Sequence, residues 1–256
     1  ISSWDVSAVR TSAELEEYLA VAKDGDVFYF DLADETDIIF SSQIELSSTA
    51  YNLANLTFES RGEGEIIFDG QDTTSHFLLN LANSNTTFEN ITFYEGYSTT
   101  GAGSIDVEDG YVTISNSTFS SNEGLNGGAV SIDASEVLSS ITNSSFFGNE
   151  STGNGGALYI LKDTIIDNST FLLNRATGNG GAIAAADTVS LSNATLYLNS
   201  ADGTGDALSS LLGLSVFEIS NSIVTSSIDS GVSSSSFNWY SEGDLGGTGD
   251  IDGTLT

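Results

Sequence analysis

The chain repeats itself with a period close to 25 residues, and this repetition constrains the fold more than any other feature of the sequence. Four repeats read Asn-x-Ser/Thr, then Phe or Leu, then two variable residues and a second Asn; they begin at Asn116, Asn143, Asn168 and Asn193. A Gly-Gly-Ala-(Val/Leu/Ile) segment follows, and its last copy decays to Gly205-Asp206-Ala207-Leu208. The first Asn recurs from Asn90 to Asn221 in steps of 26, 27, 25, 25 and 28 residues. A fixed period of this length indicates stacked units rather than a globular fold.

The residues within one repeat alternate between apolar and polar. Val112 and Ile114 precede one Asn, and Val189 and Leu191 precede another, with polar residues between them. This period of two predicts strands rather than helices. Each repeat offers a strand before the first Asn, another around the Phe and a third after the Gly pair. We therefore expect an all-β fold, a right-handed single-stranded parallel β-helix with one coil per repeat.

A single coil cannot fold alone. It buries about five large apolar side chains at ~1.5 to 3 kcal/mol each, whereas ordering its backbone costs about 1 to 2 kcal/mol per residue. Stacking completes the hydrogen-bond ladder on both sides of each coil and aligns equivalent side chains in columns. The expected internal columns are a ring stack of Phe119, Phe146 and Phe171 and an amide ladder of Asn116, Asn143, Asn168 and Asn193.

The two ends depart from the repeat. Thr11-Ser12-Ala13-Glu14 has the pattern of a capping box, and the apolar residues that follow fall at helical spacing, which predicts a short amphipathic helix over residues 12–23. We expect residues 1–24 to form an N-terminal cap that covers the end of the solenoid. Residues 25–225 would form the β-helix, with about eight or nine coils. Residues 226–256 are rich in Ser and Gly and would form a C-terminal cap or linker.

The charge balance excludes several partners. Asp and Glu number 36 against 5 Lys and Arg, a net charge of −31, so nucleic acid and anionic membrane surfaces would be repelled. The chain has no Cys, which excludes disulfides and a catalytic thiol. No apolar run approaches the ~20 residues that span a bilayer, so we expect no membrane insertion in this segment. The chain also lacks Met, which predicts a mature or excised segment, with any signal peptide or anchor outside it.

The pairing of Phe-x-x-Asn with Gly-Gly-Ala-(Ile/Leu/Val) resembles the repeats of the chlamydial polymorphic outer-membrane proteins, over roughly residues 90–210. The helix followed by Gly25-Asp26-Val27 is similar to the N-terminal cap of secreted pectate-lyase-like β-helices. The resemblance implies an extracellular or cell-surface location, often as an autotransporter passenger. Because a long ladder of coils gives a stiff rod, we expect an adhesion or scaffold module that displays a rigid binding face for a glycan or protein partner.

Catalysis is the main alternative, because polysaccharide lyases use this fold. Lyase chemistry on an acidic sugar needs cations and a base, yet the five basic residues are scattered. The sole histidine, His76, precedes an apolar run and is expected to be structural. A glycosidase needs two carboxylates, and 36 acids supply such a pair by chance. We predict no catalytic residue, and a polysaccharide lyase or glycosidase stays as the alternative.

Calcium is the one cofactor that the sequence suggests, since hard cations bind clustered oxygens. If calcium binds, the corresponding function is a calcium-stabilised surface-layer component. The simpler interpretation is that the acidic turns are solvated and bind no metal. The candidate ligands are Asp69, Asp72, Asp202, Asp206, Asp244, Asp250 and Asp252.

Hydroxyl and amide side chains recur together. Asn-x-Ser/Thr sequons invite glycosylation, but an internal Asn ladder beside a Ser/Thr column produces the same pattern, and we favour the ladder. The Ser/Thr column predicts a hydroxyl face for glycans or ice. Ice-binding sheets usually need two such rows, and the sequence offers one, so ice binding is a further alternative. The column consists of Thr118, Ser145, Thr170 and Thr195.

Overall fold

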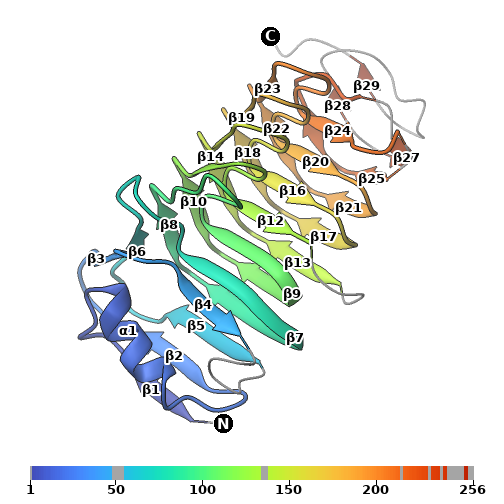
Figure 1. Ribbon diagram of the computed structural model, residues 1–256. Helices are drawn as coiled ribbons and strands as arrows, with labels where there is room; N and C mark the ends of the chain where they lie inside the picture. The colour runs from blue at the N-terminus through green and yellow to red at the C-terminus, as the bar shows by residue number, and fades with distance from the viewer. Residues whose placement is uncertain are drawn as a thin grey trace.

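The computed structural model describes residues 2–47, 55–133, 138–213, 216–229, 232–236, 239–240 and 251–252. In this part of the chain the fold is an all-β parallel solenoid of about 8 turns with ~26 residues per turn and one short helix, which confirms the predicted fold class. Figure 1 shows the coils stacked from the N-terminal to the C-terminal end of an elongated rod. Three parallel sheets, here called A, B and C, run along this rod.

Sheet A is the widest, because the long strands β7 and β9 join two rows of shorter strands side by side. One row comprises β1 (Ser3–Asp5), β2 (Val27–Phe30), β5 (Leu56–Ser60), β7 (Phe77–Glu89), β9 (Ile105–Ser115), β13 (Ser139–Thr142), β17 (Thr164–Asp167), β21 (Val189–Ser192), β25 (Phe217–Ser220) and β27 (Val232–Ser236). The other comprises β4 (Ile44–Ser47), β12 (Val130–Ile132), β16 (Leu158–Ile160), β20 (Ile183–Ala185) and β24 (Leu208–Ser210).

Sheets B and C complete each coil. Sheet B contains β3 (Thr36–Ile39), β6 (Ile66–Asp69), β8 (Thr92–Tyr94), β10 (Thr118–Ser120), β14 (Ser145–Phe147), β18 (Thr170–Leu172), β22 (Thr195–Tyr197), β26 (Ile223–Val224), β28 (Trp239–Tyr240) and β29 (Ile251–Asp252). Sheet C contains β11 (Glu123–Gly124), β15 (Glu150–Ser151), β19 (Arg175–Ala176) and β23 (Ser200–Ala201).

The helix α1 (Ser12–Leu19) lies at the N-terminal end of the rod (Figure 1). Its capping box is present as predicted: the Thr11 side chain accepts from the backbone N–H of Glu14 at 3.3 Å, and the Glu14 carboxylate accepts from the backbone N–H of Thr11 at 3.1 Å. Leu15 and Leu19 are buried and join the core. The cap and the solenoid therefore share one core.

The helix ends before the predicted residue 23, and the reason is Asp26. Its buried carboxylate accepts hydrogen bonds from the backbone N–H of Lys23 and from Trp4 Nε1, both at 2.9 Å, which turns the chain after Leu19 back toward β1. Strand β1 pairs in parallel with β2, so the ladder of sheet A begins before residue 25.

Six coils, from β7 to β25, turn from sheet A to sheet B at one left-handed residue, and this corrects the predicted amide ladder. Asn90, Asn116, Asn143, Asn168, Asn193 and Asn221 all have φ between 48° and 58°. A left-handed residue shifts the inward–outward alternation by one, so Ile114 and Phe119 both point inward although they are five residues apart. Asn116, Asn143, Asn168 and Asn193 are consequently exposed, and they form no internal ladder.

The internal amide ladder is built by the second Asn of each repeat. A second left-handed residue after β10, β14, β18 and β22 turns this Asn inward, where Asn122, Asn149, Asn174 and Asn199 are buried. The Nδ2 of each of the first three donates to the Asn Oδ1 of the next coil at 2.9 Å. Each Nδ2 also donates, at 2.9 to 3.1 Å, to the carbonyl of the aromatic residue one coil before. The ladder thus provides hydrogen-bond partners for the buried amides and carbonyls at the turn from sheet B to sheet C.

Beside this ladder runs a stack of aromatic rings. Phe119, Phe146 and Phe171 are buried, with ring centroids 4.8 Å apart and interplanar angles of 5° and 4°. Phe93 extends the stack at 4.6 Å. The centroid spacing matches the distance between neighbouring strands of a sheet, so the rings repeat with the coil.

The Gly pair makes the corner between sheets C and A. Gly155 has a φ of 69°, and a Cβ on Gly156 would lie 2.0 Å from the carbonyl oxygen of Gly181 in the next coil. Asp206 replaces the second Gly where the next coil departs from the pattern. There the Ser227 hydroxyl, rather than a backbone carbonyl, accepts from the Asp206 N–H at 3.0 Å.

Candidate functional site

The outward side chains of sheet B form rows along the rod, because equivalent residues of successive strands are paired in register. The first row is the predicted hydroxyl column, extended by one residue at the N-terminal side. Its members are Thr92, Thr118, Ser145, Thr170 and Thr195. The strands that carry these hydroxyls lie about 4.8 Å apart along the rod, the usual spacing of paired strands.

A second set of outward side chains on sheet B is apolar, and we call it the apolar row: Phe147, Leu172, Leu173, Tyr197 and Leu198. Phe147 pairs with Leu172, which pairs with Tyr197, so the three lie side by side on β14, β18 and β22. Leu173 and Leu198 follow at the left-handed corner and are 46% and 53% exposed. Sequence reasoning missed this row. Its signal was the change of the two variable residues from Ser-Ser to Phe-Gly, Leu-Leu and Tyr-Leu along the repeats.

The hydroxyl row and the apolar row together form what we call the outer face of sheet B, and from β10 to β22 its sequence is free of charge. Residues 116–122, 143–149, 168–174 and 193–199 contain no Asp, Glu, Lys, Arg or His, although 16% of the chain is charged. By chance, four or five charges would be expected in these 28 positions. The outer face is therefore an uncharged strip on a strongly acidic rod.

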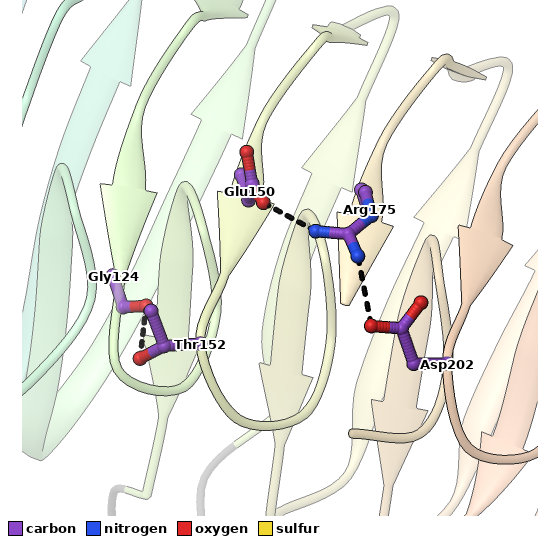
Figure 2. Close-up of polar contacts among 5 residues, drawn as sticks. All are labelled: Gly124, Glu150, Thr152, Arg175 and Asp202. Carbon is purple, nitrogen blue, oxygen red and sulfur yellow. Dashed lines mark hydrogen bonds and ion pairs between the residues drawn. The ribbon is translucent and has the colours of Figure 1, made fainter. Parts of the chain in front are cut away.

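Carboxylates flank this strip. On the sheet C side, Glu123 pairs with Glu150, which pairs with Arg175. Figure 2 shows the Arg175 guanidinium between two carboxylates, donating to Glu150 at 2.6 Å and to Asp202 at 2.8 Å. The hydrogen bond to Glu150 and the charge of Asp202 raise the pKa of Arg175. On the sheet A side, the outward rows carry Glu89 and Asp167.

A polar depression of about 260 Å³ lies at the N-terminal end of the hydroxyl row. Residues 62–65 form one wall, and Asn90, Thr92, Asn116 and Thr118 are among the residues of the other. The Thr92 hydroxyl donates to the Glu65 carboxylate. This hollow contains two glutamates, Glu63 and Glu65, and no basic side chain.

The predicted calcium ligands Asp69 and Asp72 lie at the end of β6 and in the turn after it. Asp69 Oδ1 accepts from the backbone N–H of Gln71 at 2.8 Å, and burial raises the pKa of Asp69, with smaller contributions from the charges of Glu95, Asp37 and Asp72. Within the residues that the structure describes, no group of three or more His, Asp or Glu side chains could hold a metal ion.

Asp202 and Asp206 have other partners. Asp202 binds Arg175, as described above. Asp206 Oδ1 accepts from the backbone N–H of Ala201 at 2.9 Å, and its Oδ2 accepts from the Ser227 hydroxyl at 3.0 Å. Asp244 and Asp250 lie outside the described residues, and of Asp252 only the backbone, in β29, is described.

His76 occupies the place where the internal amide ladder stops. The repeat at Phe93 has Gly96 where the later repeats have Asn, and a Cβ on Gly96 would lie 2.8 Å from His76 Cε1. The imidazole is fully buried, its Nδ1 lies 3.0 Å from the Ser104 hydroxyl, and its Nε2 has no hydrogen-bond partner. Burial lowers the pKa of His76 to about 3, against an opposing effect of the Phe68 and Tyr94 carbonyls. The ring is thus a neutral packing element of the core.

Comparison with protein families supports the resemblance that the motifs suggested. Residues 143–161 and 168–186 match the model of the Chlamydia polymorphic membrane protein repeat. These two segments run from the first Asn of a repeat into the strand after its Gly pair, so they contain the internal Asn and the apolar row of β14 and β18. No curated protein and no solved structure matches the chain. In the described ranges, no helix is long and apolar enough to cross a membrane.

Proposed function

We propose that this chain is a cell-surface or secreted adhesion or scaffold module that presents the outer face of sheet B to a glycan or protein partner. The observation that carries the proposal is an uncharged, partly apolar strip maintained over four repeats of a chain with a net charge of −31. Exposed apolar strips are uncommon on soluble proteins and mark interaction surfaces.

The solenoid suits display. Its backbone ladders, ring stack and amide ladder repeat from coil to coil, so the rod is stiff and holds a surface at a fixed distance from its ends. The matched repeat is named for membrane proteins of Chlamydia, which supports an outer-membrane or cell-surface location.

Adhesion of protein-coated beads to cultured cells, together with a glycan array, tests the proposal. We expect beads bearing the chain to adhere, and Thr170→Glu, which places a charge on the outer face, to reduce adhesion by about tenfold. Ser190→Glu is the matched control, since it adds the same charge to the outward side of β21 in sheet A. Failure to adhere to any cell or glycan, or equal loss with both variants, would contradict the proposal.

A carbohydrate-active enzyme is the rival function, and the polar depression beside Glu63 and Glu65 is where it would operate. A lyase and hydrolase screen on polysaccharides distinguishes the two. We expect binding without turnover. Measurable turnover that Glu65→Gln abolishes would replace the adhesion proposal with an enzymatic one.

We propose that the acidic turns are solvated surface rather than calcium sites. Thermal melts with calcium, with a chelator and with sodium at equal ionic strength test this. A shift of several degrees that only calcium produces would contradict it. Ice binding fits less well, because the outer face has one hydroxyl row beside an apolar row, where ice-binding sheets usually carry two rows of Thr.

A further inference from the structure

We infer that the apolar row of sheet B docks a protein segment that has an apolar centre and a basic rim. This inference rests on the proposed function and names the partner class of the same face. Its first support is the backbone beneath two of the leucines. Leu173 and Leu198 have φ values of 58° and 54°, the left-handed region that a leucine rarely adopts.

The backbone does not require leucine at these corners. Gly148 occupies the equivalent position one coil earlier with a φ of 62°, and glycine adopts this conformation without steric cost. Packing does not require leucine either, since Leu173 and Leu198 are about half exposed. Both side chains thus combine an unfavourable backbone with little burial. An external partner that covers them provides the missing stabilisation.

The neighbouring side chains enlarge the same surface. Phe147 and Tyr197 are each 42% exposed and lie in register with Leu172 between them. Aromatic side chains and leucines in one uncharged strip favour an apolar partner over a sugar, whose hydroxyl groups would need polar partners at each position.

The flanks determine the charge of the partner. A segment wider than the apolar row meets carboxylates on both sides in the same coils: Glu150 and Asp202 toward sheet C, and Asp167 toward sheet A. Arg175 neutralises part of the sheet C flank through its two ion pairs. Basic side chains on both rims of the partner would complement these flanks, whereas acidic rims would be repelled.

A second copy of the chain fits poorly. Five strands at ~4.8 Å and about four residues of ~3.3 Å give the outer face roughly 300 Å², whereas a stable interface buries about 800 Å² per partner. To bury about 800 Å² each, two copies would have to extend their contact beyond the outer face, and their acidic flanks would then face each other. A short segment of basic amphipathic helix is the better match in size, because ~24 Å corresponds to about 16 helical residues.

The test is a fluorescence-anisotropy titration of the chain with a labelled amphipathic peptide of about 18 residues made of Leu and Lys. The Leu173→Gly/Leu198→Gly variant removes the two side chains and leaves residues that suit a left-handed backbone. We expect affinity to fall about tenfold in this variant, with no loss of thermal stability. Leu212→Ser is the matched control, since Leu212 is 64% exposed but lies outside sheet B, and its affinity should stay within about twofold.

Three outcomes would overturn the inference: no binding of the Leu/Lys peptide by the unmodified chain, equal binding by the double variant, or equal binding of a Leu/Glu peptide. Equal binding by the double variant would mean that the acidic surface captures any cation. If the double variant loses stability, Leu173→Asn/Leu198→Asn repeats the test, because Asn also tolerates this backbone. The bead assay separates the two proposals. If Thr170→Glu abolishes adhesion and the double variant retains it, the surface module stands and docking on the apolar row is rejected.

Discussion

The coils between residues 116 and 199 and those between residues 27 and 95 fill the same solenoid core in two different ways. In the first region, identical side chains lie above one another: Phe119, Phe146 and Phe171 stack with interplanar angles of 5° and 4°. In the second, rings meet at mixed angles, such as 86° between Phe68 and Phe93 and 51° between Phe77 and Phe88.

The comparison shows that regular columns and an irregular cluster can both fill the core. Only the regular columns lie beside a ladder of Asn side chains that hydrogen-bond to one another. The regular coils continue the internal amide ladder from Asn122 to Asn199. At the irregular end, His76 takes the corresponding space and leaves its Nε2 unbonded. We therefore expect the regular coils to tolerate substitution less well, because their side chains have no alternative packing.

The largest expected effect is in the ring stack. Phe146→Ala should lower the free energy of unfolding by about 3 to 5 kcal/mol, since the neighbouring coils hold the cavity open. Phe77→Ala, in the irregular cluster, should fall at the low end of this range, because rings at mixed angles can shift into the gap. Denaturant melts measure both. A loss below ~1 kcal/mol in Phe146→Ala would mean that the stack contributes little.

The amide ladder is expected to come next. Asn149→Ala removes the two hydrogen bonds that Asn149 Oδ1 accepts from the backbone N–H and the Nδ2 of Asn122, and the one that Asn149 Nδ2 donates to the Phe119 carbonyl. Each buried unsatisfied group costs about 1 to 3 kcal/mol, so we expect a loss of about 3 kcal/mol. Asn143→Ala, at the exposed corner of the same coil, should cost about 1 kcal/mol, mainly through the left-handed backbone, because the hydrogen bond that it loses from Asn168 Nδ2 is exposed to solvent. Equal losses in the two variants would contradict the assignment of the ladder to the second Asn.

His76 should make the irregular end sensitive to acid. Its pKa in the folded chain is about 3, below the ordinary value of 6.5. As the pH falls through this window, the unfolded chain binds a proton that the folded chain does not. The contribution of neutral His76 to the free energy of unfolding is therefore complete above about pH 6.5 and is lost as the pH falls toward 3. Between pH 7 and pH 5 the free energy of unfolding should fall by about 2 kcal/mol.

Melts of the unmodified chain and of His76→Gln over pH 5 to 7 check this prediction. The difference between the two cancels the carboxylates, several of which also titrate abnormally, including Asp26 and Asp69. A stability difference that does not change with pH would show that the imidazole is not kept neutral by burial.

The smallest effect is expected on the surface of the regular coils. Arg175→Gln removes both ion pairs drawn in Figure 2, yet the three side chains are 45% to 55% exposed. Solvent screens such pairs, so the change in the free energy of unfolding should be the smallest of the series. A loss near that of Asn149→Ala would place the stability of this region in its surface charges rather than in its inner columns.

The left-handed corners explain why the wrong Asn was predicted to form the ladder. Continuing the alternation of Ile114 through residue 116 turns Asn116 inward, but Phe119 is also inward and lies at an odd spacing. Two inward residues five apart require one residue that breaks the alternation between them. Asn is the non-glycine residue that tolerates this conformation best. The odd spacing, with an Asn between the two inward residues, was therefore the sequence signal for a left-handed corner at Asn116.

The sequence by itself determined the coil length, the parallel solenoid, the ring column and the capping box, because each depends on spacing that repeats or on a local pattern. Tertiary structure alone decided which Asn faces inward, where His76 packs, and that Phe147, Leu172 and Tyr197 lie side by side. These features depend on the backbone conformation at the corners and on the register between coils. Both are fixed only when neighbouring coils hydrogen-bond along the rod and bring residues about 25 positions apart into contact.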